Sequence, residues 1–128
     1  MEKIGTGTYG VVYKALDTVH SHEERYVAIK KILLELRDEG LPSTAIREIC
    51  ILRELDNPYI VKLTDLVMTE SKLYLVFEFL DQDLKMYIEK FPKKEFLDME
   101  TIRSFLYQLL QGILCCHSNR MIHRDLKP

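Results

Sequence analysis

Three glycines near the amino terminus have the spacing of a loop that can bind phosphate. Gly5, Gly7 and Gly10, followed by Val12, fit the pattern G-x-G-x-x-G-x-V. Because glycine has no Cβ atom, backbone N–H groups in such a loop can approach a phosphate closely. A dinucleotide-binding βαβ unit shares this spacing but continues into a helix, whereas the run Val11–Tyr13 predicts a strand. The pattern therefore favours a phosphate-binding hairpin, with a glycine-rich hairpin that binds no ligand as the alternative.

A lysine and a glutamate further along the chain could form a buried ion pair. Lys30 ends the run Val27–Lys30 on a predicted strand, where it could place a positive charge on nucleotide phosphates. Glu48 lies on a predicted helix, Ser43–Leu55, on a face that is otherwise apolar. An inward-facing acid requires a partner, because an unpaired buried charge is strongly destabilising. The pattern therefore predicts an ion pair between Lys30 and Glu48, with a solvent-facing lysine as the alternative.

The last six residues, His123–Pro128, form a third candidate site. Asp125 follows a predicted helix and a short apolar segment, and its carboxylate could accept a proton from a substrate hydroxyl. Lys127, two residues on, could neutralise a phosphate during its transfer. A solvated loop is the alternative for this segment taken alone. Together with the glycine loop, the strand lysine and the helix acid, in this order, it indicates phosphoryl transfer.

The elements that must position these residues form a β-rich part and a helical part. Runs of β-branched and aromatic residues predict strands at 11–15, 25–32, 63–69 and 72–79, with the Ser43–Leu55 helix between the second and third. A short helix is predicted at 83–90. A long one is predicted from its cap Asp98 through His117, with apolar residues at helical spacing. We expect an α+β fold with a first domain at 1–80 and a second at 81–128.

The composition excludes several classes of protein. The 128 residues are 47% apolar and 30% charged, which is enough apolar surface for a globular fold, and the net charge is −2. Nucleic-acid-binding domains show a basic excess that is absent here. No apolar run approaches the ~20 residues that span a bilayer, and the first residues lack a signal-peptide core. We therefore expect no nucleic-acid or membrane partner, a cytoplasmic or nuclear location, and three buried thiols: Cys50, Cys115 and Cys116.

Taken in order, these motifs resemble the amino-terminal part of a protein kinase domain. The segments EGLPSTAIRE (39–48), LYLVFEFL (73–80) and QDLK (82–85) are similar to the cyclin-dependent kinases in particular. The resemblance covers essentially the whole chain, apart from a connection at 17–24 that is a few residues longer than usual. It implies a kinase small lobe, an antiparallel sheet plus one helix, followed by the first helices of a large lobe. It also implies transfer of the ATP γ-phosphate, with Mg²⁺, to Ser or Thr hydroxyls of protein substrates.

The resemblance assigns catalytic roles to residues of this sequence. The glycine loop would cover the ATP phosphates, and Lys30 would hold them while paired with Glu48. Asp125 would be the catalytic base, and Lys127 would lie beside the γ-phosphate.

The same resemblance assigns the nucleotide site. Main-chain groups of Glu78 and Leu80 would bind adenine. Asp83, which also has the pattern of a helix N-cap, would reach the ribose. The walls of the adenine pocket would be four apolar residues: Ile4, Val12, Ala28 and Phe77.

Regulation and a partner are implied as well. Thr8 and Tyr9 occupy positions of inhibitory phosphorylation in the family, where added negative charge beside ATP would be repulsive. Arg47 and Arg124 would converge on a phosphorylated activation loop. Ile46 lies about 200° round the helix from Glu48 and would point outward. The resemblance implies a cyclin bound through the Ser43–Leu55 helix, with Ile46 as an anchor; an isolated surface isoleucine is the alternative.

Parts of a kinase domain are missing from the 128 residues. The asparagine that follows H-R-D and ligates a metal would come two residues after Pro128, and the D-F-G and A-P-E segments are absent. We expect a truncated large lobe, no metal ligands, and no kinase activity of these residues on their own. A non-catalytic fragment that binds cyclin or nucleotide is the alternative.

Overall fold

The computed structural model describes residues 1–7, 10–18, 25–33, 43–69, 72–92 and 96–128. Within these ranges it does not describe six side chains, those of Leu33, Ser43, Thr44, Ala45, Arg47 and Glu48. The chain divides into two compact units. The first unit comprises Met1–Glu54 and Val61–Phe79, and the second comprises Leu55–Ile60 and Leu80–Pro128.

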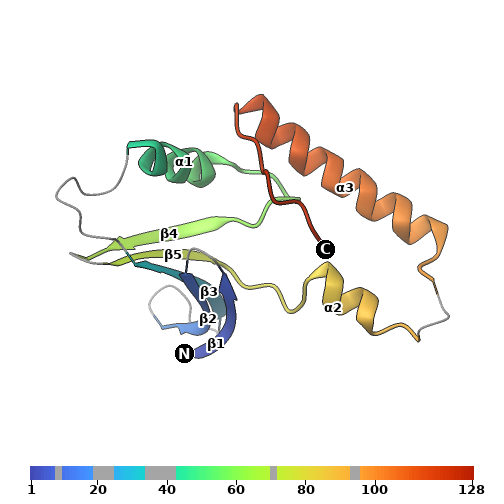
Figure 1. Cartoon of the computed structure of the whole chain (residues 1–128), viewed down its shortest axis with the longest axis horizontal. Helices are drawn as coiled ribbons and strands as arrows, with labels where there is room; N and C mark the ends of the chain where they lie inside the picture. The colour runs from blue at the N-terminus through green and yellow to red at the C-terminus, as the bar shows by residue number, and fades with distance from the viewer. Residues whose placement is uncertain (8–9, 19–24, 34–42, 70–71, 93–95) are drawn as a thin grey trace. The chain divides into compact units, whose positions relative to one another are not determined.

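One antiparallel sheet dominates the described part of the first unit (Figure 1). Its five strands are β1 (Glu2–Gly7), β2 (Gly10–Asp17), β3 (Arg25–Leu33), β4 (Leu63–Met68) and β5 (Lys72–Glu78). Their order is β1-β2-β3-β5-β4, so β5 lies between β3 and β4. The predicted strands are confirmed, and with them the α+β class.

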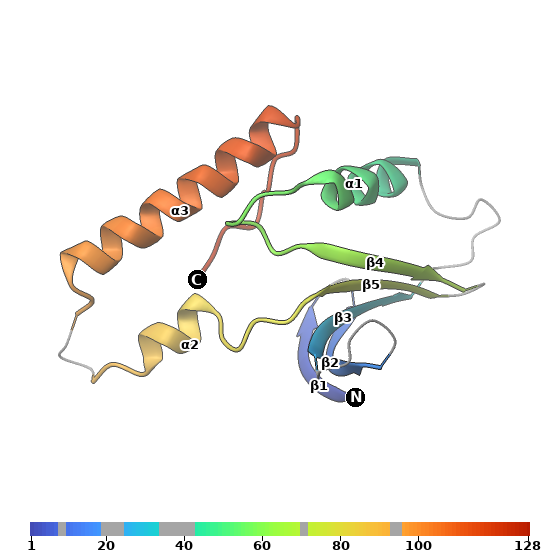
Figure 2. The ribbon, with the colours of Figure 1, turned by 180° about the vertical axis from the view of Figure 1, so that it is seen from behind.

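The core of the first unit lies between the sheet and helix α1 (Ser43–Glu54). Both views show α1 beside β4, which it contacts (Figures 1 and 2). Ile49 and Leu52 of α1 pack against the buried cluster, which comprises Leu63, Leu73 and Leu75. The apolar spacing of this helix therefore places one of its faces on the sheet, as the sequence predicts.

The outward side of α1 carries Ile46 and Cys50, which are one helical turn apart. Ile46 is 48% exposed, and Cys50 is also exposed. The expectation of a buried thiol at Cys50 is therefore wrong, because the face that packs on the sheet is the one with Ile49 and Leu52. Cys116 is buried, and Cys115 is partly buried.

The second unit contains α2 (Leu84–Glu89) and α3 (Met99–Ser118). Both predicted N-caps are confirmed. The Asp83 carboxylate accepts a hydrogen bond from the Met86 N–H at 2.7 Å, and that of Asp98 from the Thr101 N–H at 2.8 Å. The hydrogen bonds with Thr101 also lower the pKa of Asp98. No helix in the described ranges is both long enough and apolar enough to cross a membrane.

A left-handed turn ends α3 and directs the chain toward the last residues. The N–H of Arg120 donates to the carbonyl of His117, and that of Met121 donates to the carbonyl of Cys116, both at 2.9 Å. Arg120 has φ 59°, so these bonds form a Schellman motif with arginine where glycine is usual. The sequence has no glycine at this turn to predict it. The two hydrogen bonds end α3, and the segment that contains Asp125 begins after them.

Candidate active site

The register of β2, β3 and β5 brings four predicted nucleotide-binding residues to one face of the sheet. Val12 pairs with Lys30, and Ala28 pairs with Phe77. Since side chains alternate between the two faces of a strand, these pairs lie in adjacent rows of the same face. Ile4, the other predicted wall residue, lies at an irregularity of β1 and is 47% exposed. The first unit therefore places three apolar side chains and Lys30 on one face of the sheet.

The glycine loop joins β1 to β2, with Gly7 paired to Gly10. Thr8 and Tyr9 lie outside the described residues, so their proposed phosphorylation stays a prediction. Gly10 has φ 154°, and a Cβ atom there would be 2.1 Å from the carbonyl oxygen of Lys31. At Gly5 an added Cβ would be 3.9 Å from that of Val12, an ordinary contact. The fold therefore requires glycine at position 10 and tolerates a side chain at position 5.

Gly10→Ala should destabilise the first unit by about 1–3 kcal/mol, because the backbone must leave its positive φ and move away from β3. Gly5→Ala is the matched control and should leave stability within about 1 kcal/mol of the parent. Urea unfolding, followed by amide hydrogen exchange in β2 and β3, measures both. Equal stabilities of the two variants would contradict a requirement for glycine at position 10.

The predicted ion pair between Lys30 and Glu48 stays a prediction. The structure places Lys30 on β3 and position 48 on α1, but the side chain of Glu48 is outside the described set. The side chain of Arg47 is also outside the described set, so its predicted role stays a prediction. Leu52, one turn after position 48, packs on the core.

The end of β5 is held by the segment before β4. The Glu78 N–H donates to the Lys62 carbonyl at 3.1 Å, and the Lys62 N–H donates to Glu78 Oε1 at 2.9 Å. Because its N–H is bonded in this way, Glu78 can offer adenine its carbonyl oxygen only. Leu80 is 57% exposed. Asp83 caps α2, and its contact with a ribose stays a prediction.

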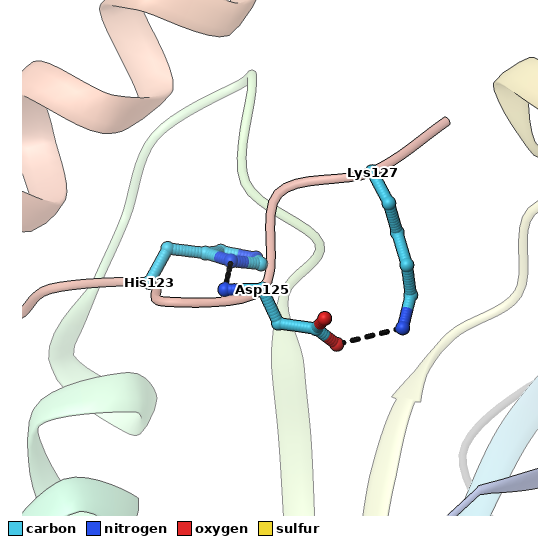
Figure 3. A network of polar contacts seen from close by, with 3 residues as sticks. All are labelled: His123, Asp125 and Lys127. Atoms are coloured by element: carbon cyan, nitrogen blue, oxygen red, sulfur yellow. Dashed lines mark hydrogen bonds and ion pairs between the residues drawn. The ribbon is translucent and has the colours of Figure 1, made fainter.

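Two of the predicted catalytic residues, Asp125 and Lys127, are in direct contact with each other (Figure 3). Lys127 Nζ donates to Asp125 Oδ2 at 2.8 Å, and the Asp125 N–H donates to His123 Nδ1 at 3.2 Å. Both members of the ion pair are about 70% exposed, with side-chain values of 70% and 72%. Arg124, between His123 and Asp125 in the chain, has a left-handed backbone with φ 62°. The segment thus presents a carboxylate and an ammonium group together at its surface.

The contact with Lys127 extends the pH range in which Asp125 is ionised. The Lys127 hydrogen bond, followed by its positive charge, lowers the pKa of Asp125 below its ordinary value of 3.8. A lowered pKa means that the carboxyl group is ionised at neutral pH and remains ionised further into the acidic range. The ionised form is the one that can accept a proton from a hydroxyl group.

Lys127→Met should raise the pKa of Asp125 toward its ordinary value, because both the hydrogen bond and the charge are lost. The carboxylate would then protonate at a higher pH than in the parent. NMR titration of the Asp125 carboxyl carbon measures this shift. Lys127→Arg keeps the charge and should keep the pKa lowered, while an unchanged pKa in Lys127→Met would contradict the assignment.

A metal site is not built by the residues that the structure describes. Among them, no group of three or more His, Cys, Asp or Glu side chains could hold a metal ion.

Comparison with known protein families matches the chain over its whole length. The model of the protein kinase domain family covers residues 1–128. The chain therefore belongs to the protein kinase domain family. Members of this family are transferases that bind ATP, use Mg²⁺ and phosphorylate proteins.

Proposed function

We propose that the protein is a Ser/Thr kinase of the cyclin-dependent type, which transfers the γ-phosphate of ATP to protein hydroxyls. The catalytic part of this proposal rests on the contact between Lys127 Nζ and Asp125 Oδ2 at 2.8 Å. It brings a proton acceptor and a positive charge to the same place on the chain. Phosphoryl transfer depends mainly on such positioning and charge neutralisation, with little covalent chemistry.

Each residue has a distinct task in this proposal. Asp125, which is ionised at neutral pH, accepts the proton of the substrate hydroxyl. Lys127 turns from Asp125 toward the transferring phosphate and offsets its charge. In the first unit, Lys30 holds the other phosphates, while Val12, Ala28 and Phe77 contact adenine.

Support for a cyclin comes from the outward side of α1. Ile46 is half-exposed there, although its neighbours Ile49 and Leu52 pack on the core. An exposed isoleucine on a helix that also carries the expected partner of Lys30 would let a bound protein control the site through helix position. The resemblance of residues 39–48 to the cyclin-dependent kinases favours a cyclin as that protein.

The test is a transfer assay with the protein at its native length, ATP labelled on its γ-phosphate, Mg²⁺ and a generic protein substrate. Transfer should require an added cyclin, and the label should appear as phosphoserine and phosphothreonine. Cyclin-independent transfer would contradict the cyclin-dependent type. Label on phosphotyrosine alone would contradict the Ser/Thr specificity.

A further inference from the structure

Lys14 lies over two aromatic rings at one end of the sheet. Its Nζ atom is 4.1 Å from the centroid of the Tyr26 ring and 4.5 Å from that of Phe79. The ring centroids are 6.2 Å apart, and the ring planes are tilted by 60°. These residues come from β2, from β3 and from the residue after β5. One ammonium group therefore joins three segments of the first unit, which we call the Lys14 cluster (Lys14, Tyr26 and Phe79).

The Lys14 cluster continues the sheet face that carries the candidate nucleotide residues. Lys14 pairs with Ala28, and Ala28 pairs with Phe77. Tyr26 and Phe79 are each two residues away from these positions along their own segments, so they occupy the next row of the same face. Lys14 therefore lies beside Ala28 and Phe77, the two proposed adenine contacts in its row of the sheet.

The main chain beside the cluster is also held from the other neighbouring strand. Glu78 exchanges two hydrogen bonds with Lys62, which lies just before β4. Phe79 follows Glu78 directly and is held by Lys14 and Tyr26 from the β3 side. Glu78 and Phe79 thus have contacts on both sides, and these contacts restrain the main chain that joins them.

We infer that Lys14 is a positioning residue for the adenine nucleotide. By holding Phe79 it fixes the main chain of Glu78, whose carbonyl oxygen is the group offered to adenine. This inference rests on the proposed function, because it assumes that Glu78 binds the base. A cation–π contact at an exposed site is worth about two- to fivefold in an equilibrium constant, so losing two contacts should weaken binding about 4- to 25-fold.

The test measures dissociation constants of ATP and of adenosine for the protein at its native length by titration calorimetry. Lys14→Met keeps an unbranched side chain and removes the cation, and Lys14→Arg keeps a cation. Lys14→Met should weaken the binding of ATP and of adenosine by the same factor of about 4–25, and Lys14→Arg should keep both dissociation constants within about threefold of the parent. Lys31→Met removes a lysine from the opposite face of β3 and should bind like the parent.

Adenosine distinguishes a positioning role from a phosphate contact, because it carries no phosphate that a lysine could attract. Weaker ATP binding with unchanged adenosine binding would overturn the inference and make Lys14 a phosphate contact. Unchanged binding of both ligands by Lys14→Met, even with a lower melting temperature, would also overturn it and leave a structural role. If the parent binds neither ligand, the proposed function fails, and the inference that rests on it fails as well. If the parent binds both ligands, the comparison with Lys14→Met tests the inference by itself.

Discussion

Replacing Asp125 by asparagine should lower the rate of phosphoryl transfer about 10²- to 10⁴-fold and leave the KM for ATP nearly unchanged. The asparagine amide has nearly the same shape as the carboxylate but cannot take up the hydroxyl proton. It also ends the ion pair with Lys127, whose Nζ lies 2.8 Å from Asp125 Oδ2. The loss should therefore appear in kcat, because the residues proposed to hold the nucleotide are left intact.

The measurement is kcat and KM for ATP in the cyclin-dependent transfer assay. Asp65→Asn is the matched control, since Asp65 is an exposed aspartate of β4 that accepts a local hydrogen bond from the Leu66 N–H. This control should change kcat by no more than about threefold. If Asp125→Asn keeps most of the kcat of the parent, Asp125 is not the catalytic base.

Local signals in the sequence located the elements and their ends. Asp83 and Asp98 are followed by helical patterns, and each accepts a hydrogen bond from the N–H three residues on. An N-cap depends only on residues within one turn, so sequence alone could predict it. Strands β2 to β5 were predictable for the same reason, because β-branched and aromatic runs mark them locally, whereas β1 has no such run.

Contacts between distant segments could not be predicted in this way. The Lys14 cluster requires β5 to lie beside β3, although β4 precedes β5 in the chain. The pairing order of strands is not encoded in the alternation of one strand. The contact between Asp125 and Lys127 joins residues only two positions apart, but the left-handed backbone of the neighbouring Arg124 could not be predicted, because no glycine marks it.

The expected roles of single residues were predictable to different degrees. Val12 and Lys30, like Ala28 and Phe77, share a sheet face because of strand register, as their predicted common site requires. Cys50 was misplaced, because a cysteine is most often buried and only the packing of α1 shows that this one is not. The same packing leaves Ile46 exposed, which the helical phase of Glu48 predicted.

The exposed side chain of Ile46 can be tested as the cyclin anchor. Ile46→Glu should weaken cyclin binding about 30- to 150-fold, because a charge would enter an apolar contact at a cost of about 2–3 kcal/mol. Glutamate is a good helix former, so α1 itself should remain folded. Binding is measured by titration of cyclin, and circular dichroism reports the helix.

A matched control separates this surface from a general effect of added charge. Val67 is 47% exposed, close to the 48% of Ile46. It lies on the sheet face opposite to that of Leu66 and Leu75, against which α1 packs. Val67→Glu should therefore change the dissociation constant by no more than about threefold. Equal weakening by both variants would mean that charge, not the α1 surface, decides binding, and unchanged binding by Ile46→Glu would remove Ile46 as the anchor.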